Sequence, residues 1–241
     1  MVRIKNHFDE RYNEYSIFLA SPKTLPCLDR DFFEWHNGIS HYGFWAVLIN
    51  DLNWIELWNA ARAQIKQFVH PGYQRMPHVT IIACGLLDQN HFSNEQFKQQ
   101  WRALSETMIP PFYLKVSSLN SFTTAPCLMI EDSTGTLKQI RDCLTVISKE
   151  DEPVQYQPHI TLGLYRDAFC TVEVAGCLAR FKYTSIKPML VTELAFCVYE
   201  TKEIQGQFRV IKQVRLNAKP GLRSGNAKKE ISLQGLRSGG E

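Results

Sequence analysis

Two pentapeptides of this chain carry nearly the same pattern, Pro77-His78-Val79-Thr80-Ile81 and Pro158-His159-Ile160-Thr161-Leu162. Because side chains alternate between the faces of a β-strand, the histidine and threonine of each copy point to one face. The aliphatic residues then point to the opposite face, toward a core. Proline is tolerated at the first residue of a strand and keeps the preceding residue extended. The sequence therefore predicts two copies of one device, an imidazole beside a hydroxyl on an open strand face.

The surroundings of the two pentapeptides predict a duplicated fold. Further strands are expected at 42–49, 112–118 and 127–131, and the motif strands at 78–86 and 159–165. Helical spacing of apolar residues covers 51–69, 93–104 and 137–147, and a closing hairpin covers 191–199 and 207–216. Each motif strand belongs to a strand–helix–strand half. We therefore expect an α+β fold of two lobes, with antiparallel sheets around a central cleft and helices on the outside.

Two of the expected helices carry start signals. Asp51 or Asn53 can cap the helix over 51–69, and Ser93 with Gln96 has the spacing of a capping box. We divide the chain into an N-terminal extension over 1–40, one domain over 41–216 and a flexible basic tail over 217–241. In the extension, 16–21 could form a short strand and 29–36 one or two helical turns. The tail is rich in Gly, Ser and Lys, a composition typical of flexible segments.

Charge and composition exclude several function classes. The formal net charge is +3, and the basic excess of 217–241 accounts for all of it, so the rest of the chain is neutral. A neutral body lacks the basic surface of a duplex-binding protein. Apolar runs such as 44–49 are too short to cross a membrane, and no secretory signal is visible at the N-terminus. Seven scattered cysteines without a Cys-x-x-Cys pair favour reduced thiols. We expect a cytoplasmic monomer.

The paired motifs suit acid–base chemistry at phosphorus. Displacement at a phosphodiester between His78 and His159 needs a base at the attacking oxygen and an acid at the leaving oxygen. Imidazole serves in both roles because its pKa is near 6.5. Thr80 and Thr161 can donate hydrogen bonds to the non-bridging oxygens. The sequence has no His-Glu-x-x-His, Cys/His cluster, carboxylate-rich loop or phosphate-binding glycine loop, so we predict no metal and no cofactor.

These motifs resemble those of the two-histidine phosphoesterase superfamily, also called the 2′-5′ RNA ligase-like or cyclic phosphodiesterase fold, over about residues 41–216. Within it, the sequence is most similar to the plant-type cyclic nucleotide phosphodiesterases. Residues 42–47, Tyr-Gly-Phe-Trp-Ala-Val, look like the opening strand of that family, which also carries Trp before Ala. The motifs at 76–80 and 157–161 match its two motifs, although the second is more often His-x-Ser there. The closing hairpin is similar as well.

The resemblance implies metal-independent hydrolysis of small cyclic phosphates, such as nucleoside 2′,3′-cyclic phosphates or ADP-ribose 1″,2″-cyclic phosphate. A small cyclic nucleotide or a short RNA end would be the substrate. One histidine activates water and the other protonates the leaving sugar oxygen. Related enzymes often use the first-motif histidine as the acid, which gives His78 as acid and His159 as base. The near-symmetry of the cleft allows either order.

Three aromatic residues are candidates for stacking on the substrate, namely Trp45, Phe122 and Tyr165. Trp45 shares strand parity with Val47, which is equally consistent with a core position. The family has an aromatic residue soon after its second motif. Here Gly163 adds a residue, so a bulge decides whether Leu164 or Tyr165 faces the cleft.

Two alternative functions remain open. The first is a phosphodiesterase that cuts 2′-5′ or 3′-5′ linkages in short oligonucleotides, in RNA processing or anti-phage signalling. The second is a nucleotide-binding module that has kept the cleft and lost the chemistry. An N-terminal extension that covered part of the cleft would also restrict the size of the substrate.

Overall fold

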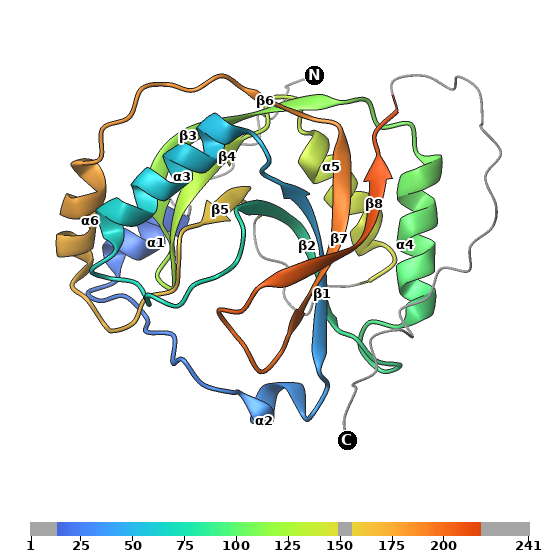
Figure 1. Cartoon of the computed structure of the whole chain (residues 1–241), viewed down its shortest axis with the longest axis horizontal. Coiled ribbons are helices and arrows are strands. Elements are labelled where there is room, and N and C mark those ends of the chain that lie inside the picture. Colours follow the sequence, from blue (N-terminus) through green and yellow to red (C-terminus); the bar gives the residue numbers. More distant parts are fainter. Residues whose placement is uncertain (1–13, 149–155, 218–241) are drawn as a thin grey trace, which may run out of the picture.

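Two four-stranded antiparallel sheets form the centre of the structure (Figure 1), a computed structural model that describes residues 14–148 and 156–217. The first sheet has the order β2-β1-β7-β8, from β1 (His41–Leu48), β2 (His78–Leu86), β7 (Glu193–Glu200) and β8 (Phe208–Arg215). The second has the order β5-β4-β3-β6, from β3 (Phe112–Ser121), β4 (Pro126–Glu131), β5 (His159–Thr161) and β6 (Met189–Val191). Strands β2 and β5 are both edge strands, and they adjoin each other. The predicted α+β fold of two lobes is confirmed.

Two helices connect the lobes, because each follows a strand of one sheet and packs on a strand of the other sheet. Helix α3 (Leu52–Ile65) follows β1 of the first sheet but packs on β4 of the second. Helix α5 (Thr136–Thr145) follows β4 of the second sheet but packs on β2 of the first. Helices α1 (Glu14–Ala20) and α6 (Thr171–Ala179) cover β3, and α4 (Asn94–Glu106) packs on β8. Each lobe is therefore covered in part by a helix that follows a strand of the other lobe.

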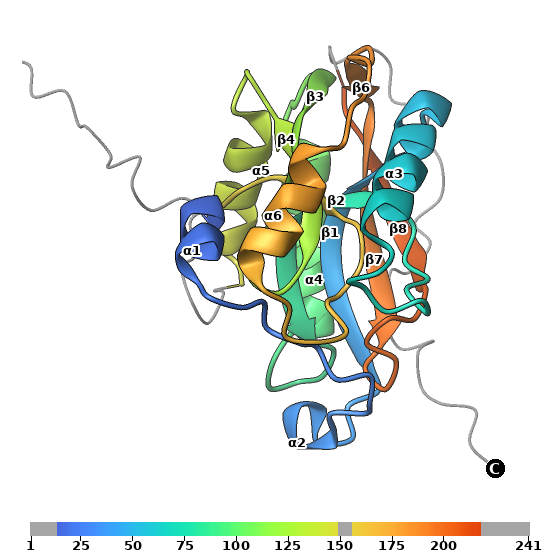
Figure 2. The same cartoon turned by 90° about the vertical axis from the view of Figure 1, so that its left-hand side faces the viewer.

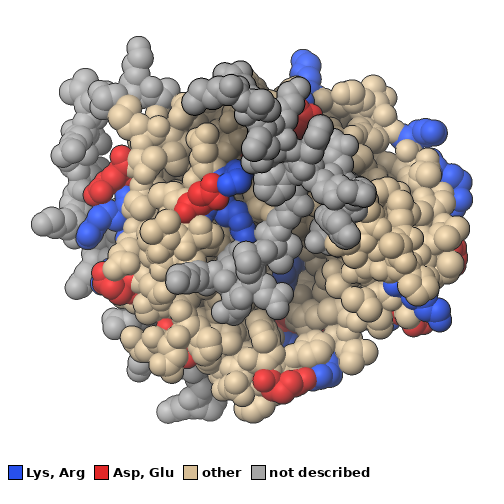
Figure 3. Space-filling model, turned by 180° about the vertical axis from the view of Figure 1, so that it is seen from behind, with Lys and Arg blue, Asp and Glu red and all other residues tan. Residues whose placement is uncertain are grey.

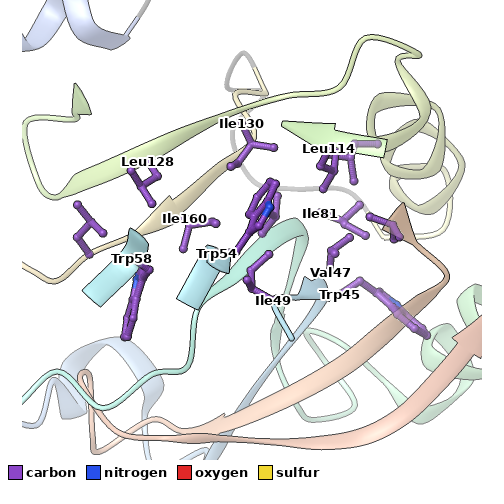
Figure 4. Packing of buried hydrophobic residues seen from close by; sticks show 14 of the residues in the cluster. Trp45, Val47, Ile49, Trp54, Trp58, Ile81, Leu114, Leu128, Ile130 and Ile160 are labelled. Carbon is purple, nitrogen blue, oxygen red and sulfur yellow. The ribbon is translucent and has the colours of Figure 1, made fainter. Parts of the chain in front are cut away.

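One continuous core fills the space between the sheets and the helices. Figure 4 shows apolar side chains from both sheets meeting Trp54 and Trp58 of α3 in this core. Both indole N–H groups are satisfied: Trp54 Nε1 donates to Lys187 O at 3.0 Å, and Trp58 Nε1 donates to Thr161 O at 3.0 Å. A buried indole needs such a partner. The Trp58 bond also anchors the end of the second motif strand.

The predicted helix starts are confirmed by their caps. The Asp51 carboxylate accepts hydrogen bonds from the backbone N–H groups of Asn53 and Trp54. Ser93 and Gln96 form the reciprocal capping box, in which each side chain binds the backbone of the other. Such caps satisfy N–H groups that have no partner within the helix.

Two predicted elements differ from the structure. Residues 16–21 were expected to be a strand, but Glu14–Ala20 form helix α1, whose Phe18 is buried while its neighbours are exposed. The second motif strand ends at Thr161, because the chain then leaves β4 and Tyr165 pairs with Val69. A Cβ at Gly163 would lie 3.1 Å from Val69 Cβ, a tight contact, and the φ of +157° would strain any larger residue there. Helix α6 and strand β6 were not predicted.

The N-terminal segment crosses both lobes. The backbone N–H groups of Thr24, Leu25 and Cys27 donate at 2.8 Å to carbonyls of the second lobe, at Phe169, Thr123 and Tyr165. The segment then passes through α2 (Phe33–His36) and reaches the first sheet, where Thr201 N donates to Ser40 O at 3.0 Å. Figure 2 shows α2 at the end of the molecule, next to the start of β1. The domain boundary at residue 41 stays a prediction.

The described surface carries charges of both signs. On the face seen in Figure 3, acidic and basic side chains lie in small mixed groups. No helix in the described part of the chain is long and apolar enough to cross a membrane. The predicted flexible tail, apart from Asn217, lies outside the described residues.

Candidate active site

The two motif strands bring their polar residues to one cavity. Val79 and Ile160 are buried in the core, as strand alternation requires. On the opposite faces, His78 and Thr80 from β2 and His159 and Thr161 from β5 line a cavity of about 580 Å³. This volume lies in the range of small-molecule sites. The predicted pairing of two imidazoles and two hydroxyls across one cleft therefore exists in the structure.

Both imidazoles are held in the same way. His78 Nδ1 donates to Met76 O at 2.7 Å, and His159 Nδ1 donates to Gln157 O at 2.8 Å. Because a carbonyl oxygen only accepts hydrogen bonds, the neutral rings carry their proton on Nδ1 and a lone pair on Nε2. The Nε2 atom of each ring is therefore the one that can exchange a proton with a ligand.

The backbone before each histidine is fixed in the same way as well. Pro77 O accepts from Ile49 N at 3.1 Å, and Pro158 O accepts from Ile130 N at 2.9 Å. In each case the donor belongs to, or directly follows, the strand next to the motif strand. Proline keeps the residue before it extended, which places its carbonyl under the imidazole. The repeated pentapeptide therefore gives both histidines the same backbone support and the same ring orientation.

Burial controls the charge of both histidines. Desolvation lowers the pKa of His78 to about 4, and the positive charges of Arg75 and His159 add to this, against the hydrogen bond to Met76. Desolvation also lowers the pKa of His159, partly offset by the hydrogen bond to Gln157. Both rings are therefore neutral at pH 7 in the free protein. A bound phosphate anion would favour the imidazolium form and raise both pKa values.

Aromatic side chains restrict both imidazoles. The His78 ring lies 5.3 Å from the Phe44 ring and 4.9 Å from the Phe208 ring, measured between centroids. The Phe122 ring meets the His159 ring edge-on at 4.6 Å. These contacts exclude water from one side of each ring, and charge interactions are stronger in such an environment.

The sequence did not predict the arginine and tyrosine side chains that line the cavity. Arg75, Arg141, Tyr73 and Tyr156 all line the cavity. Arg141 donates through Nη1 to Ile81 O at 2.7 Å, and the Tyr156 hydroxyl donates to Thr80 O at 3.0 Å. Two arginines provide the positive charge that phosphate binding requires.

One regularity of the sequence could have identified two of these residues. Arg75 and Tyr156 each stand three positions before a motif histidine. The repeat of the pentapeptides therefore extends to this upstream position, although the residue types differ. Arg141 and Tyr73 carry no comparable signal, because the fold alone brings them to the cavity.

Of the three predicted stacking residues, the structure places only Phe122 at the cavity. Trp45 is fully buried, and its Nε1 donates to Gln100 Oε1 at 2.9 Å in the core. Tyr165 is also fully buried, with its hydroxyl 2.6 Å from Ser121 Oγ, and Leu164 lines the cavity in its place. Trp45 and Tyr165 are core residues, because their strand or bulge positions face inward, and the expectation that they contact a ligand was wrong.

The site therefore combines two proton-exchanging nitrogens, two threonine hydroxyls and two guanidinium groups around one cavity. This arrangement can hold a phosphate and exchange protons with it at two positions. In residues 14–148 and 156–217, no three His, Cys, Asp or Glu side chains gather as metal ligands would.

Comparison with known proteins places these features in context. The family model described as the 2'-5' RNA ligase superfamily matches residues 51–203. No curated protein matches the sequence. Escherichia coli LigT, solved with 3'-AMP, is similar in structure at 16% identity with a TM-score of 0.48, covering 74% of this chain and 99% of LigT. TT0787 of Thermus thermophilus is similar at 15% identity with a TM-score of 0.46, covering 73% and 97%. ATU0111 of Agrobacterium tumefaciens shows 14% identity and a TM-score of 0.48, covering 87% and 93%.

Proposed function

Because the chain belongs to the 2'-5' RNA ligase superfamily, we propose that it hydrolyses a cyclic phosphodiester without a metal, through the paired imidazoles of His78 and His159. Membership of the family supports phosphodiesterase activity in general. The observation that carries the proposal is the identical mounting of two imidazoles, each through Nδ1, on one cavity. Nucleoside 2′,3′-cyclic phosphates and ADP-ribose 1″,2″-cyclic phosphate, as in the plant-type enzymes, are the proposed substrates.

In the proposed reaction, Nε2 of one histidine takes a proton from water as the water oxygen attacks phosphorus. The bond from phosphorus to one sugar oxygen breaks, and the second imidazolium gives that oxygen its Nε2 proton. Each such proton transfer contributes about 10²–10⁴-fold to the rate. His78 as acid and His159 as base is the order that the family resemblance implies, and the reverse order uses the same geometry.

The remaining lining residues stabilise the charge that develops on phosphate. Thr80 and Thr161 donate hydroxyl hydrogen bonds to the non-bridging oxygens. Arg75 and Arg141 supply positive charge, and Phe122 offers a ring face to the base of the substrate. The neutral body of the chain fits a small anionic ligand better than a duplex. We further propose that residues 41–216 are the catalytic domain of a cytoplasmic monomer.

The test is hydrolysis of 2′,3′-cyclic AMP in the presence of EDTA, followed by phosphorus NMR. The proposal predicts ring opening at the same rate with and without EDTA, because all the proton transfers use side chains. Loss of activity on chelation would contradict it. Parallel incubations with 2′-5′ and 3′-5′ oligoadenylates identify the first alternative by their cleavage. Tight nucleotide binding without turnover would identify the non-catalytic module.

A further inference from the structure

A second pocket opens beside the catalytic cavity. It has a volume of about 310 Å³ and is lined by Phe32, Trp35, Tyr199 and Ile204, among others. Arg75 and Leu164 line both this pocket and the catalytic cavity, so the two spaces share a wall. The volume is at the lower end for small-molecule sites, which suits one flat ring system.

Aromatic rings connect the second pocket to the catalytic histidine. Successive centroid distances run from Trp35 to Tyr42 at 5.6 Å, from Tyr42 to Tyr199 at 5.2 Å, and from Tyr199 to Phe44 at 6.1 Å. The Phe44 ring then lies 5.3 Å from the His78 ring. The Trp35 side of this series is not closed off from solvent, since Trp35 is 44% exposed. A large aromatic face that is partly open to water is suited to stacking on a base.

Arg75 stands at the junction of the two spaces in a fixed position. Its Nη2 donates to Ile204 O at 2.8 Å, and its guanidinium lies 4.1 Å from the centroid of the Tyr199 ring. Its Nε is buried and has no hydrogen-bond partner among the described residues. This nitrogen is therefore closed off from a ligand, and what Arg75 offers at the junction is the positive charge of a guanidinium that lines both spaces. A phosphate is attracted to such a charge.

The N-terminal segment builds this pocket and holds it in place. Phe32 and Trp35 flank the start and middle of α2, and the following chain is fastened to the first sheet. Thr201 Oγ1 donates to Ile39 O at 2.6 Å, next to the bond from Thr201 N to Ser40 O. Figure 1 shows α2 below β1 and the β7–β8 turn. The family model begins only at residue 51, so Phe32 and Trp35 lie outside the match.

We propose that this pocket is a second base subsite, and that the substrate is at least a dinucleotide that ends in a cyclic phosphate. The base upstream of the reacting nucleotide stacks on Trp35, and the phosphate that links the two nucleotides binds Arg75. The inference rests on the proposed function and narrows its substrate class, from free cyclic nucleotides to cyclic-phosphate ends of short oligonucleotides.

The test compares kcat/KM for the dinucleotide ApA bearing a 2′,3′-cyclic phosphate with kcat/KM for 2′,3′-cyclic AMP. The wild type should prefer the dinucleotide by about tenfold or more, the effect of stacking one base. Trp35→Ala should lose this preference, and Trp35→Phe should retain part of it. Phe33→Ala is the matched control, because Phe33 is on the same helix, is more exposed and does not line the pocket. If Trp35→Ala and Phe33→Ala prefer the dinucleotide over 2′,3′-cyclic AMP equally, the proposed subsite is wrong.

A binding measurement separates this inference from the proposed function. Titration calorimetry with ApA bearing a 3′-phosphate, which has no cyclic phosphate to open, needs no turnover. Weaker binding in Trp35→Ala than in Phe33→Ala, by about tenfold, supports the subsite even if no cyclic phosphate is hydrolysed. Hydrolysis of both cyclic substrates with no effect of Trp35→Ala on binding or on preference removes the subsite and leaves the proposed function standing.

Discussion

Acidification should destabilise the protein through His78. Burial lowers the pKa of this imidazole to about 4 in the folded state, whereas an unfolded histidine titrates near 6.5. As the pH falls below the unfolded value, the unfolded chain binds a proton that the folded chain refuses until about pH 4. Stability is therefore lost as the pH falls through this window. Between about pH 7 and about pH 4.5, the linkage relation gives a loss of about 2 kcal/mol from His78 alone.

Urea unfolding followed by tryptophan fluorescence measures this loss. His78→Gln removes the titrating ring, so its free energy of unfolding should fall by about 2 kcal/mol less than that of the wild type over the same pH interval. All other titrating groups contribute to both proteins and largely cancel in the difference.

An equal loss in the wild type and His78→Gln would refute this reasoning. It would mean that the His78 imidazole is already charged, or is solvated, in the folded protein. The conclusion that burial keeps the His78 ring neutral at pH 7 in the free protein would then fall with it.

Three further predictions follow from the same contacts. To react, the free enzyme needs one neutral and one protonated histidine, and burial lowers the pKa of both. The optimum of kcat/KM for 2′,3′-cyclic AMP should therefore lie below about pH 6.5. An optimum above pH 7 would contradict this expectation. Trp45→Phe should cost about 1–2 kcal/mol in urea unfolding, because Gln100 Oε1 loses its indole donor, while kcat/KM stays within about twofold; a selective loss of activity would restore Trp45 as a ligand residue. Ser93→Ala removes the capping box of α4 and should cost about 1 kcal/mol, and an unchanged urea midpoint would show that the cap is dispensable.

Local sequence patterns predicted most of the helices and strands. Strand alternation placed His78 and Thr80 on one face and Val79 on the other, and the caps at Asp51 and Ser93 located two helix starts. Helix α6 was missed because its N-cap, Cys170, makes no side-chain cap, and Gly176 lowers the helix propensity of the segment. Helix exchange between the lobes leaves no trace in local sequence, since it depends on contacts between distant segments.

The site residues on the two motif strands were predicted from the sequence. The lining residues that come from other segments were not, because only the fold brings them to the cavity. Arg75 is oriented by Tyr199 and Ile204, which come from the far end of the chain. The role of Trp45 could not be read from parity, because a strand inside a two-lobed fold can present a tryptophan to a cleft or to a core. The partner Gln100 settles it, and that contact is long-range.

The proposed reaction requires that His78 and His159 act as one catalytic unit. A double-mutant cycle on 2′,3′-cyclic AMP hydrolysis in EDTA, with His78→Ala, His159→Ala and the double variant, tests it most directly. We expect each single variant to lower kcat by about 10²–10⁴-fold and the double variant to be hardly slower than either. Full activity in either single variant, or losses that simply multiply in the double variant, would contradict it.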